Sequence, residues 1–399
     1  MAIAENLALI TCYIKSGRKV TTFASKNKNN AKKKCSLRDI FNSFVNFAVI
    51  IWDFAHGNTS FNVGNVSIRL CLQREYSPHQ KSFIMEYRAL GKTGLEVSTI
   101  GFGASSLGGV FHSFDENRGI DAVFTGIDAG INYIDVSPYY GHYKAETVLG
   151  KALKDIPHEK FVLSTKVGRY GEDGKNTWDY SAERVTRSAY ESMERLHIDF
   201  IDILYVHDIE FQASLPGGLQ KIADETLPAL LRLKEEGVVK HVGVTDLQLE
   251  NLKWIVEHTP AGTIECLLSF CHFCLNDDKL ADFLDFFDEH NVGVTNASPF
   301  SMGLLTERGV PEWHPAPKPL VRKCAEAAEY CKQQGYPIEK LAMQYSCSNP
   351  RVASTVFSTT RPENLLKNIA YVEEPIDWNL VEKVKEIIGD QQRVSWANT

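Results

Sequence analysis

Four ionisable side chains near the middle of the sequence could together move a proton. Asp135, Lys166 and His207 each stand at the end of a short apolar or β-branched run, and Tyr140 follows Asp135 by five residues. A Lys ammonium beside a phenol favours the phenolate and lowers the pKa of the Tyr, while a carboxylate keeps the Lys charged. A neutral imidazole can hydrogen-bond a substrate oxygen. If the fold brings them together, the four could act on a hydroxyl or a carbonyl.

Each of these residues also has an ordinary structural interpretation. A single Asp at the end of a strand usually caps a helix, and a single Tyr usually lies at the rim of the barrel. A single Lys usually extends into solvent, and a single His is usually a polar residue with its hydrogen bonds satisfied. Only the four residues together indicate a catalytic site. Whether they form one depends on the secondary-structure elements that position them.

Eight short β-branched runs alternate with segments of helical period between residues 99 and 373. The predicted strands are Thr99–Gly103, Ile131–Asp135, Phe161–Thr165, Ile201–Val206, His241–Val244, Ile264–Leu268, Gly293–Thr295 and Ser354–Phe357. Apolar strands of this kind are buried on both faces, as in parallel sheets covered by crossover helices. Thr360 with Glu363 indicates a capping box at the start of a late helix.

Eight such units favour a closed (β/α)8 barrel over an open doubly wound sheet. Gly101, Gly103, Gly108 and Gly109 do not have the spacing of a dinucleotide-binding Gly-x-Gly-x-x-Gly turn. In a barrel the functional groups lie at the carboxyl ends of the strands, which is where Asp135, Lys166 and His207 are expected.

The charge of the chain divides it into two parts. Residues 1–84 carry 12 Lys and Arg against 4 Asp and Glu, although the whole chain of 399 residues has a net charge of -7. We therefore expect a basic extension at 1–84, poorly structured, and one barrel domain at 85–399. The acidic barrel domain disfavours nucleic acid as a partner, since binding phosphates needs a basic surface.

The extension fits none of the common targeting segments well. Its apolar stretch at 40–52 is thirteen residues long, while a membrane span needs about 20. A basic, acid-poor segment is compatible with a transit peptide, which would imply import into an organelle. We favour the alternative that Met85 is the real start, and hence a cytoplasmic protein.

The nine cysteines do not indicate a disulfide framework or a metal site. Their number is odd and they are scattered through a long chain. Cys271 and Cys274 form a single pair without a second pair at ligand spacing, so we expect two buried thiols and no metal.

From residue 85 onward the sequence resembles the aldo-keto reductases. The resemblance rests on GLEVSTIGFGASSLGG (94–109), INYIDVSPYYG (131–141), STKVGRY (164–170), DILYVHD (202–208), ASPFSMGLL (297–305) and TTRPENLLKN (359–368). It implies a (β/α)8 barrel, Asp135, Tyr140, Lys166 and His207 as the catalytic tetrad, and a nicotinamide cofactor. SFCHFCLND, HDIEF and PEWHPA resemble the sugar-oxidising members, which implies NAD-dependent oxidation of the anomeric carbon of an aldose. The expected reaction converts L-galactose to L-galactono-1,4-lactone, a step of ascorbate biosynthesis.

The resemblance also implies where the cofactor would bind. The expected cofactor-binding residues are Gly103, Thr245, Ser269, Ser298, Gly303, Leu304, Ser358, Thr359, Thr360, Asn364 and Asn368. NAD is favoured over NADP, because Ser358 and Asn364 stand where NADPH-using members place Lys and Arg, although Arg361 is nearby. The aromatic residue that stacks on the nicotinamide is replaced by Ala297, so Phe270 or His272 is expected to supply a ring face.

Three alternatives remain open at this point. The chain could be an NADPH-dependent carbonyl reductase, a dehydrogenase of another aldose, or a cofactor-binding regulatory subunit like the β subunits of channels. The expected partner is a small sugar rather than a nucleic acid or a membrane, and the barrel is expected to work as a monomer or weak homodimer.

Overall fold

The structure is a computed structural model, and it describes residues 60–63, 66–69, 85–109, 113–172, 175–312 and 314–397. The chain divides into two compact units, residues 1–80 and 81–399. In the first unit, β1 (Ser60–Val63) and β2 (Val66–Arg69) pair as an antiparallel hairpin. The remaining predictions for residues 1–84 lie outside the described residues. The start of the mature chain and its compartment therefore stay predictions.

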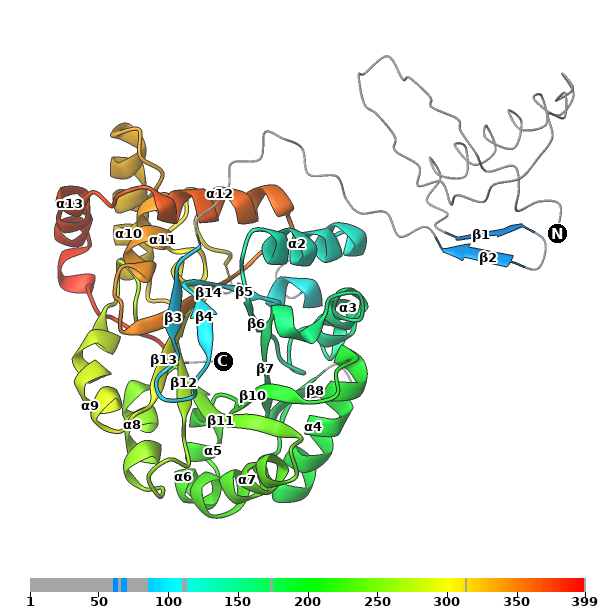
Figure 1. The fold of residues 1–399 in the computed structure, drawn as a ribbon. Helices are drawn as coiled ribbons and strands as arrows, with labels where there is room; N and C mark the ends of the chain where they lie inside the picture. The colour runs from blue at the N-terminus through cyan, green and yellow to red at the C-terminus, as the bar shows by residue number, and fades with distance from the viewer. Residues whose placement is uncertain are drawn as a thin grey trace, which may run out of the picture. The chain divides into compact units, whose positions relative to one another are not determined.

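Within the described part of the second unit, eight parallel strands close into a barrel, seen along its axis in Figure 1. The strands are β5 (Ile100–Gly103), β6 (Tyr133–Asp135), β7 (Val162–Val167), β10 (Ile201–Val206), β11 (Val239–Asp246), β12 (Cys266–Phe270), β13 (Gly293–Ala297) and β14 (Val352–Ser358). Each strand pairs with the next barrel strand along the chain, and β14 returns to β5. The predicted (β/α)8 barrel is confirmed.

Helices follow every barrel strand and cover the outside of the sheet (Figure 1). They are α2 (Glu116–Asp128), α3 (Lys144–Leu153), α4 (Ala182–Leu196), α7 (Leu227–Glu235), α8 (Leu249–Glu257), α9 (Leu284–Glu289), α11 (Ile338–Cys347) and α12 (Pro362–Glu373). Helix α4 illustrates why they form. Ser181 caps it by accepting from the Arg184 N–H, and Val185 and Ala189 bury the face that packs on the barrel.

Further elements interrupt this regular alternation. They are η1 (Ser105–Gly108), η2 (His158–Lys160), β8 (Arg169–Glu172), β9 (Lys175–Trp178), α5 (Glu210–Ala213), α6 (Gly218–Lys221), the π-helical η3 (Ile222–Thr226), η4 (Lys279–Phe283), η5 (Ser301–Gly303), α10 (Lys318–Gln333), α13 (Trp378–Ile388) and η6 (Gly389–Gln391). Several follow the carboxyl ends of barrel strands, so they build up the end of the barrel where a site is expected. In the described part of the chain, no helix combines the length and apolarity needed to cross a bilayer.

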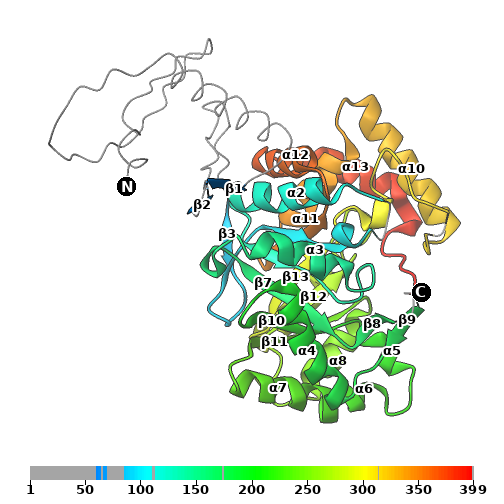
Figure 2. The same cartoon turned by 90° about the vertical axis from the view of Figure 1, so that its right-hand side faces the viewer.

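A hairpin closes the opposite end of the barrel. Strands β3 (Tyr87–Ala89) and β4 (Glu96–Ser98) pair antiparallel, and Figure 2 shows β3 at the end away from β8 and β9. Leu90 and Val97 are fully buried there, in one cluster with Tyr133 and Tyr205 of the barrel interior. Gly91 has φ +55°, and a Cβ there would lie 2.4 Å from the Gly293 nitrogen, so only glycine fits this contact.

We expect Leu90→Ala to lower the free energy of unfolding by about 2–5 kcal/mol, because it leaves a cavity in this closed end. Urea unfolding measures the change. The matched control is Leu215→Ala, because Leu215 is 46% exposed and its truncation leaves no cavity. Equal effects of the two substitutions would show that the hairpin does not close the core.

Some local predictions need correction. Strand β6 begins at Tyr133 rather than at residue 131, and β11 extends from Val239 to Asp246. The capping box at Thr360 and Glu363 is wrong: the N-cap of α12 is Arg361, because Pro362 occupies the first helical turn and sets where the helix starts.

Candidate active site

A cavity of about 670 Å³ opens at the carboxyl ends of the barrel strands. Asp135 ends β6, Lys166 lies near the end of β7, and His207 directly follows β10. Tyr140 follows β6 in the loop before α3. All four line this cavity. The fold therefore brings together the four side chains that the sequence singled out.

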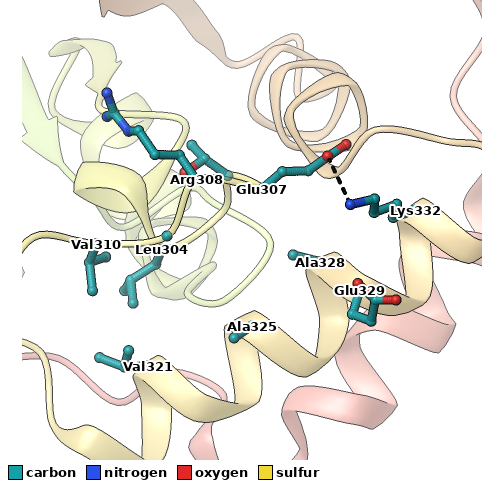
Figure 3. Close-up of a pocket in the computed structure, with 11 residues that line it drawn as sticks. Leu304, Glu307, Arg308, Val310, Val321, Ala325, Ala328, Glu329 and Lys332 are labelled. Atoms are coloured by element: carbon teal, nitrogen blue, oxygen red, sulfur yellow. Dashed lines mark ion pairs between the residues drawn. The ribbon is translucent and has the colours of Figure 1, made fainter.

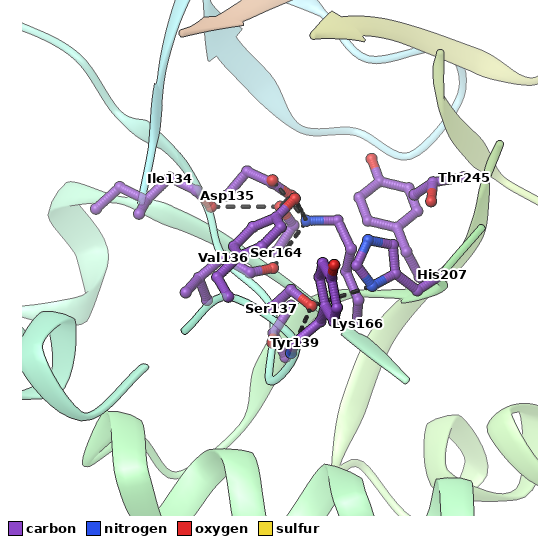
Figure 4. Close-up of polar contacts among 12 residues, drawn as sticks. Ile134, Asp135, Val136, Ser137, Tyr139, Ser164, Lys166, His207 and Thr245 are labelled. Atoms are coloured by element: carbon purple, nitrogen blue, oxygen red, sulfur yellow. Dashed lines mark hydrogen bonds and ion pairs between the residues drawn. The ribbon is translucent and has the colours of Figure 1, made fainter. Parts of the chain in front are cut away.

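Lys166 is the centre of this group. Its Nζ donates to Asp135 Oδ1 at 2.6 Å, to the Val136 carbonyl at 2.8 Å and to Tyr140 Oη at 3.2 Å. Figure 4 shows Asp135, Ser164 and Lys166 facing one another. The other oxygen of Asp135 accepts from Ser164 Oγ at 2.7 Å. The ammonium is thus held in place by three acceptors, one of which is the phenol oxygen.

The electrostatics at Tyr140 correct one expectation. Burial raises the pKa of Tyr140 to about 12, because it disfavours the phenolate more strongly than the Lys166 ammonium favours it. Asp135 and Asp208 add to the rise. Lys166 does lower the pKa of Tyr140, as expected. The net shift is nevertheless upward in the protein without a bound cofactor, so the expected net lowering is wrong.

The pKa of Lys166 itself is raised. Burial opposes its charge, and the attraction of Asp135 and Tyr140 outweighs that cost. The ammonium therefore stays charged although it is 1% exposed.

His207 is held as a neutral imidazole. Burial lowers its pKa to about 3, with Lys166 and Arg169 acting in the same direction and Asp208 against it. Its Nδ1 lies 3.1 Å from Ser137 Oγ, a contact visible in Figure 4. Ser137 Oγ also accepts from the Tyr139 N–H at 3.1 Å, so its own proton is free to go to Nδ1. We assign Ser137 as the donor to Nδ1, which places the proton of the imidazole on Nε2.

Eight of the expected cofactor-binding residues line the same cavity. They are Gly103, Thr245, Ser298, Gly303, Ser358, Thr359, Thr360 and Asn364. The last three surround the N-terminus of α12, whose free N–H groups favour an anion. Hydroxyl groups and a helix N-terminus are suitable donors for the phosphates and ribose of a dinucleotide.

Three expected cofactor-binding residues lie elsewhere. Ser269 stands between Leu268 and Phe270, which line the cavity, and alternation along β12 turns it toward the helices. Leu304 lines an adjoining pocket of about 290 Å³ between its loop and α10, which shares Thr306 and Arg308 with the cavity (Figure 3). Asn368 donates to the Asn364 carbonyl one turn earlier in α12. These three do not line the cavity, and their role in cofactor binding stays a prediction.

The structure also shows lining residues that the sequence analysis missed. Ser106 of η1 donates through its N–H to Ser358 Oγ at 2.8 Å, and the two hydroxyls are 2.8 Å apart. Arg169, Asp208 and Arg308 line the cavity too. Arg169 and Asp208 lie inside the motifs at 164–170 and 202–208. Their closeness in sequence to Lys166 and His207 could have identified them as lining residues.

Of the two candidates for a ring face, only Phe270 lines the cavity, and it pairs with Ala297 across the sheet. His272 is buried and bound on both nitrogens, to Asp277 Oδ2 and the Leu247 carbonyl. It does not line the cavity, so Phe270 is the better placed of the two candidates.

Cys271 and Cys274 are buried, and burial raises the pKa of both thiols. Neither is a reactive thiolate under ordinary conditions. Among the residues that the structure describes, no three His, Cys, Asp or Glu are grouped in a way that could hold a metal ion.

The comparison with protein families shows the family of the chain. The model of the aldo/keto reductase family matches residues 99–388. The chain belongs to the aldo/keto reductase family. Members of this family are oxidoreductases that use nicotinamide cofactors, in agreement with the resemblance of the sequence motifs.

Individual aldo/keto reductases are similar over most of the chain. L-galactose dehydrogenase of Arabidopsis thaliana is 42% identical over 320 residues, which cover 79% of this chain and 98% of that protein. D-threo-aldose 1-dehydrogenase of a Pseudomonas species is 28% identical, covering 75% of this chain and 96% of the relative. The holo form of an aldo-keto reductase of Bacillus halodurans superposes with a TM-score of 0.63 at 26% identity, covering 78% of this chain and all of that one.

Proposed function

We propose that this aldo/keto reductase is an NAD-dependent aldose 1-dehydrogenase that oxidises L-galactose to L-galactono-1,4-lactone. The observation that carries the proposal is Tyr140 Oη, held 3.2 Å from the Lys166 ammonium in a 670 Å³ cavity that also contains His207. The 42% identity to an L-galactose dehydrogenase across nearly all of that protein supports the choice of sugar.

In this mechanism Tyr140 accepts the proton of the anomeric hydroxyl as that carbon is oxidised. Lys166 stabilises the negative charge that develops on the phenol oxygen, and Asp135 balances the charge of Lys166. His207, neutral and with its Nε2 proton available, donates to the same substrate oxygen and orients it. For carbonyl reduction the roles reverse, and Tyr140 is the acid.

A nicotinamide cofactor would supply the hydride acceptor when bound. The donors in the cavity fit such a group. Ser106 and Ser358 offer hydroxyls, Thr359 and Thr360 stand at the N-terminus of α12, and the face of Phe270 lies next to the small Ala297. These residues would hold the ends of the cofactor and leave Tyr140 at the reacting carbon.

The choice of NAD rests on charge. The 2′-phosphate of NADP needs Arg or Lys side chains, whereas a free ribose hydroxyl is satisfied by neutral groups such as Ser358 and Asn364. Arg308 and Arg361 line the same cavity, so the two cofactors must be compared directly.

We expect kcat/KM for NAD to exceed that for NADP by at least about tenfold with L-galactose as substrate, because Ser358 and Asn364 are neutral and offer no charge to a 2′-phosphate. Initial rates at equal concentrations of the two cofactors measure this ratio. L-fucose and simple aldehydes serve as comparison substrates. If NADPH-dependent aldehyde reduction is fast and no aldose is oxidised with either cofactor, the enzyme is a carbonyl reductase and the proposal is wrong.

A further inference from the structure

A buried ion pair beside the tetrad has no role in the mechanism above. Arg169 Nη1 and Asp208 Oδ2 lie 2.6 Å apart, and the two residues are 5% and 7% exposed. Both line the cavity that contains Tyr140 and His207. Burying two charges costs free energy even when they are paired. Stability alone therefore does not explain why an ion pair lies at this place.

Arg169 is fixed in position but incompletely bonded. Its guanidinium carbon lies 3.8 Å from the centre of the Tyr139 ring and 4.6 Å from that of Phe211, which hold the planar group between them. Its Nε has no hydrogen-bond partner among the described residues. A buried donor without a partner is rare in folded proteins, so Arg169 keeps hydrogen-bonding capacity that the described residues do not use.

Asp208 is also fixed in position. Its backbone has φ +47°, a conformation that is uncommon for residues other than glycine. Its N–H donates to Thr245 Oγ1 at 3.0 Å, and Tyr180 Oη donates to its carbonyl at 2.8 Å. These bonds direct the carboxylate toward the cavity wall, where Oδ2 lies 3.5 Å from His207 Nε2.

The pair therefore presents donors and an acceptor next to the imidazole that faces the reacting oxygen. Burial opposes ionisation of Asp208, but the charged Arg169, which also donates to it, and Lys166 hold the pKa of its carboxyl below the usual value, so the acceptor stays charged. A guanidinium beside a carboxylate can bond two neighbouring hydroxyl groups at once, one donating and one accepting. Adjacent ring hydroxyls are what an aldose has and a simple aldehyde lacks.

We propose that Arg169 and Asp208 form a hydroxyl-binding subsite for the sugar ring, and that they make the enzyme select aldoses over simple carbonyl compounds. This inference rests on the proposed function and adds the residues that determine its specificity.

The test compares Arg169→Lys with the wild-type enzyme on two substrates. Lysine keeps the positive charge opposite Asp208 but removes the planar fork of donors. We expect kcat/KM for L-galactose oxidation to fall about 10- to 100-fold, mainly through KM, because a charge-assisted hydrogen bond to the sugar is lost. Reduction of 4-nitrobenzaldehyde, which has no ring hydroxyls, should change less than about threefold.

Arg184→Lys is the matched control. Arg184 is also buried, stacks on a tyrosine ring at 3.9 Å and pairs with Glu191, but it does not line the cavity. It should leave the ratio of the two activities unchanged. Asp208→Asn, a second variant that keeps the shape of the side chain, should shift that ratio in the same direction as Arg169→Lys.

The outcomes separate the two proposals. If the wild-type enzyme oxidises L-galactose and Arg169→Lys lowers both activities equally, or neither, the subsite is wrong and the proposed function stands. If the wild-type enzyme reduces the aldehyde but oxidises no aldose, both are wrong. Thermal melts of the variants distinguish loss of folding from loss of binding.

Discussion

Replacing Tyr140 with Phe should lower kcat for aldose oxidation by about 10³-fold, because it removes the group that accepts the substrate proton. The ring of Tyr140 packs edge-on against His207 at 5.9 Å between centres, and Phe preserves that contact. We therefore expect the affinity for NADH, measured by fluorescence titration, to change less than about threefold. Steady-state rates with L-galactose and NAD measure kcat.

Tyr190→Phe is the matched control for this substitution. Tyr190 is 46% exposed on α4, outside the cavity, and loses the same hydroxyl. Wild-type kcat in Tyr140→Phe would contradict the assignment of Tyr140. Loss of NADH binding together with activity would instead point to a collapsed cavity.

Lys166→Met should lower kcat/KM for oxidation by at least about 100-fold. Burial already raises the pKa of Tyr140 to about 12, and the Lys166 ammonium is the charge that opposes this rise. An opposite charge at this distance shifts a pKa by roughly 1–3 units, so its loss leaves Tyr140 a far less accessible base.

The substitution also leaves the Asp135 carboxylate buried without its partner, which costs about 3–5 kcal/mol. A double variant separates the two effects. Adding Asp135→Asn to Lys166→Met removes the unpaired charge and should recover much of the melting temperature without recovering activity. Recovery of activity in the double variant would contradict the role of Lys166.

The dependence on pH gives a second readout of the same chemistry. Tyr140 is protonated at neutral pH in the protein alone, and the phenolate fraction rises tenfold for each pH unit below its pKa. We expect kcat/KM for oxidation in the wild-type enzyme to rise from pH 7 to pH 10, and aldehyde reduction to stay nearly flat below about pH 9, since Tyr140 retains the proton that it donates. No step near pH 6.5 is expected, because the pKa of His207 is lowered to about 3.

Much of the fold was predictable because its signals are local. Each barrel strand is a short buried run such as Ile201–Val206, and the helices between them repeat apolar residues with helical period. The prediction from local patterns was wrong where a single proline changed the start of a helix. Pro362 sets the start of α12 and makes Arg361 the N-cap, although Thr360 and Glu363 have the spacing of a capping box.

The sequence by itself determined that Asp135, Tyr140, Lys166 and His207 follow neighbouring parallel strands, and parallel strands present their carboxyl ends at one end of a barrel. Only the tertiary structure decided the direction in which the pKa of Tyr140 moves, because burial depends on packing from many segments. It also decided that Ser269, Leu304 and Asn368 are not among the residues that line the cavity, and that Arg169 meets Asp208, 39 residues later in the chain. The alternation of residue types specifies each element, but distances between side chains depend on how distant elements pack, and these distances set the electrostatics of the site.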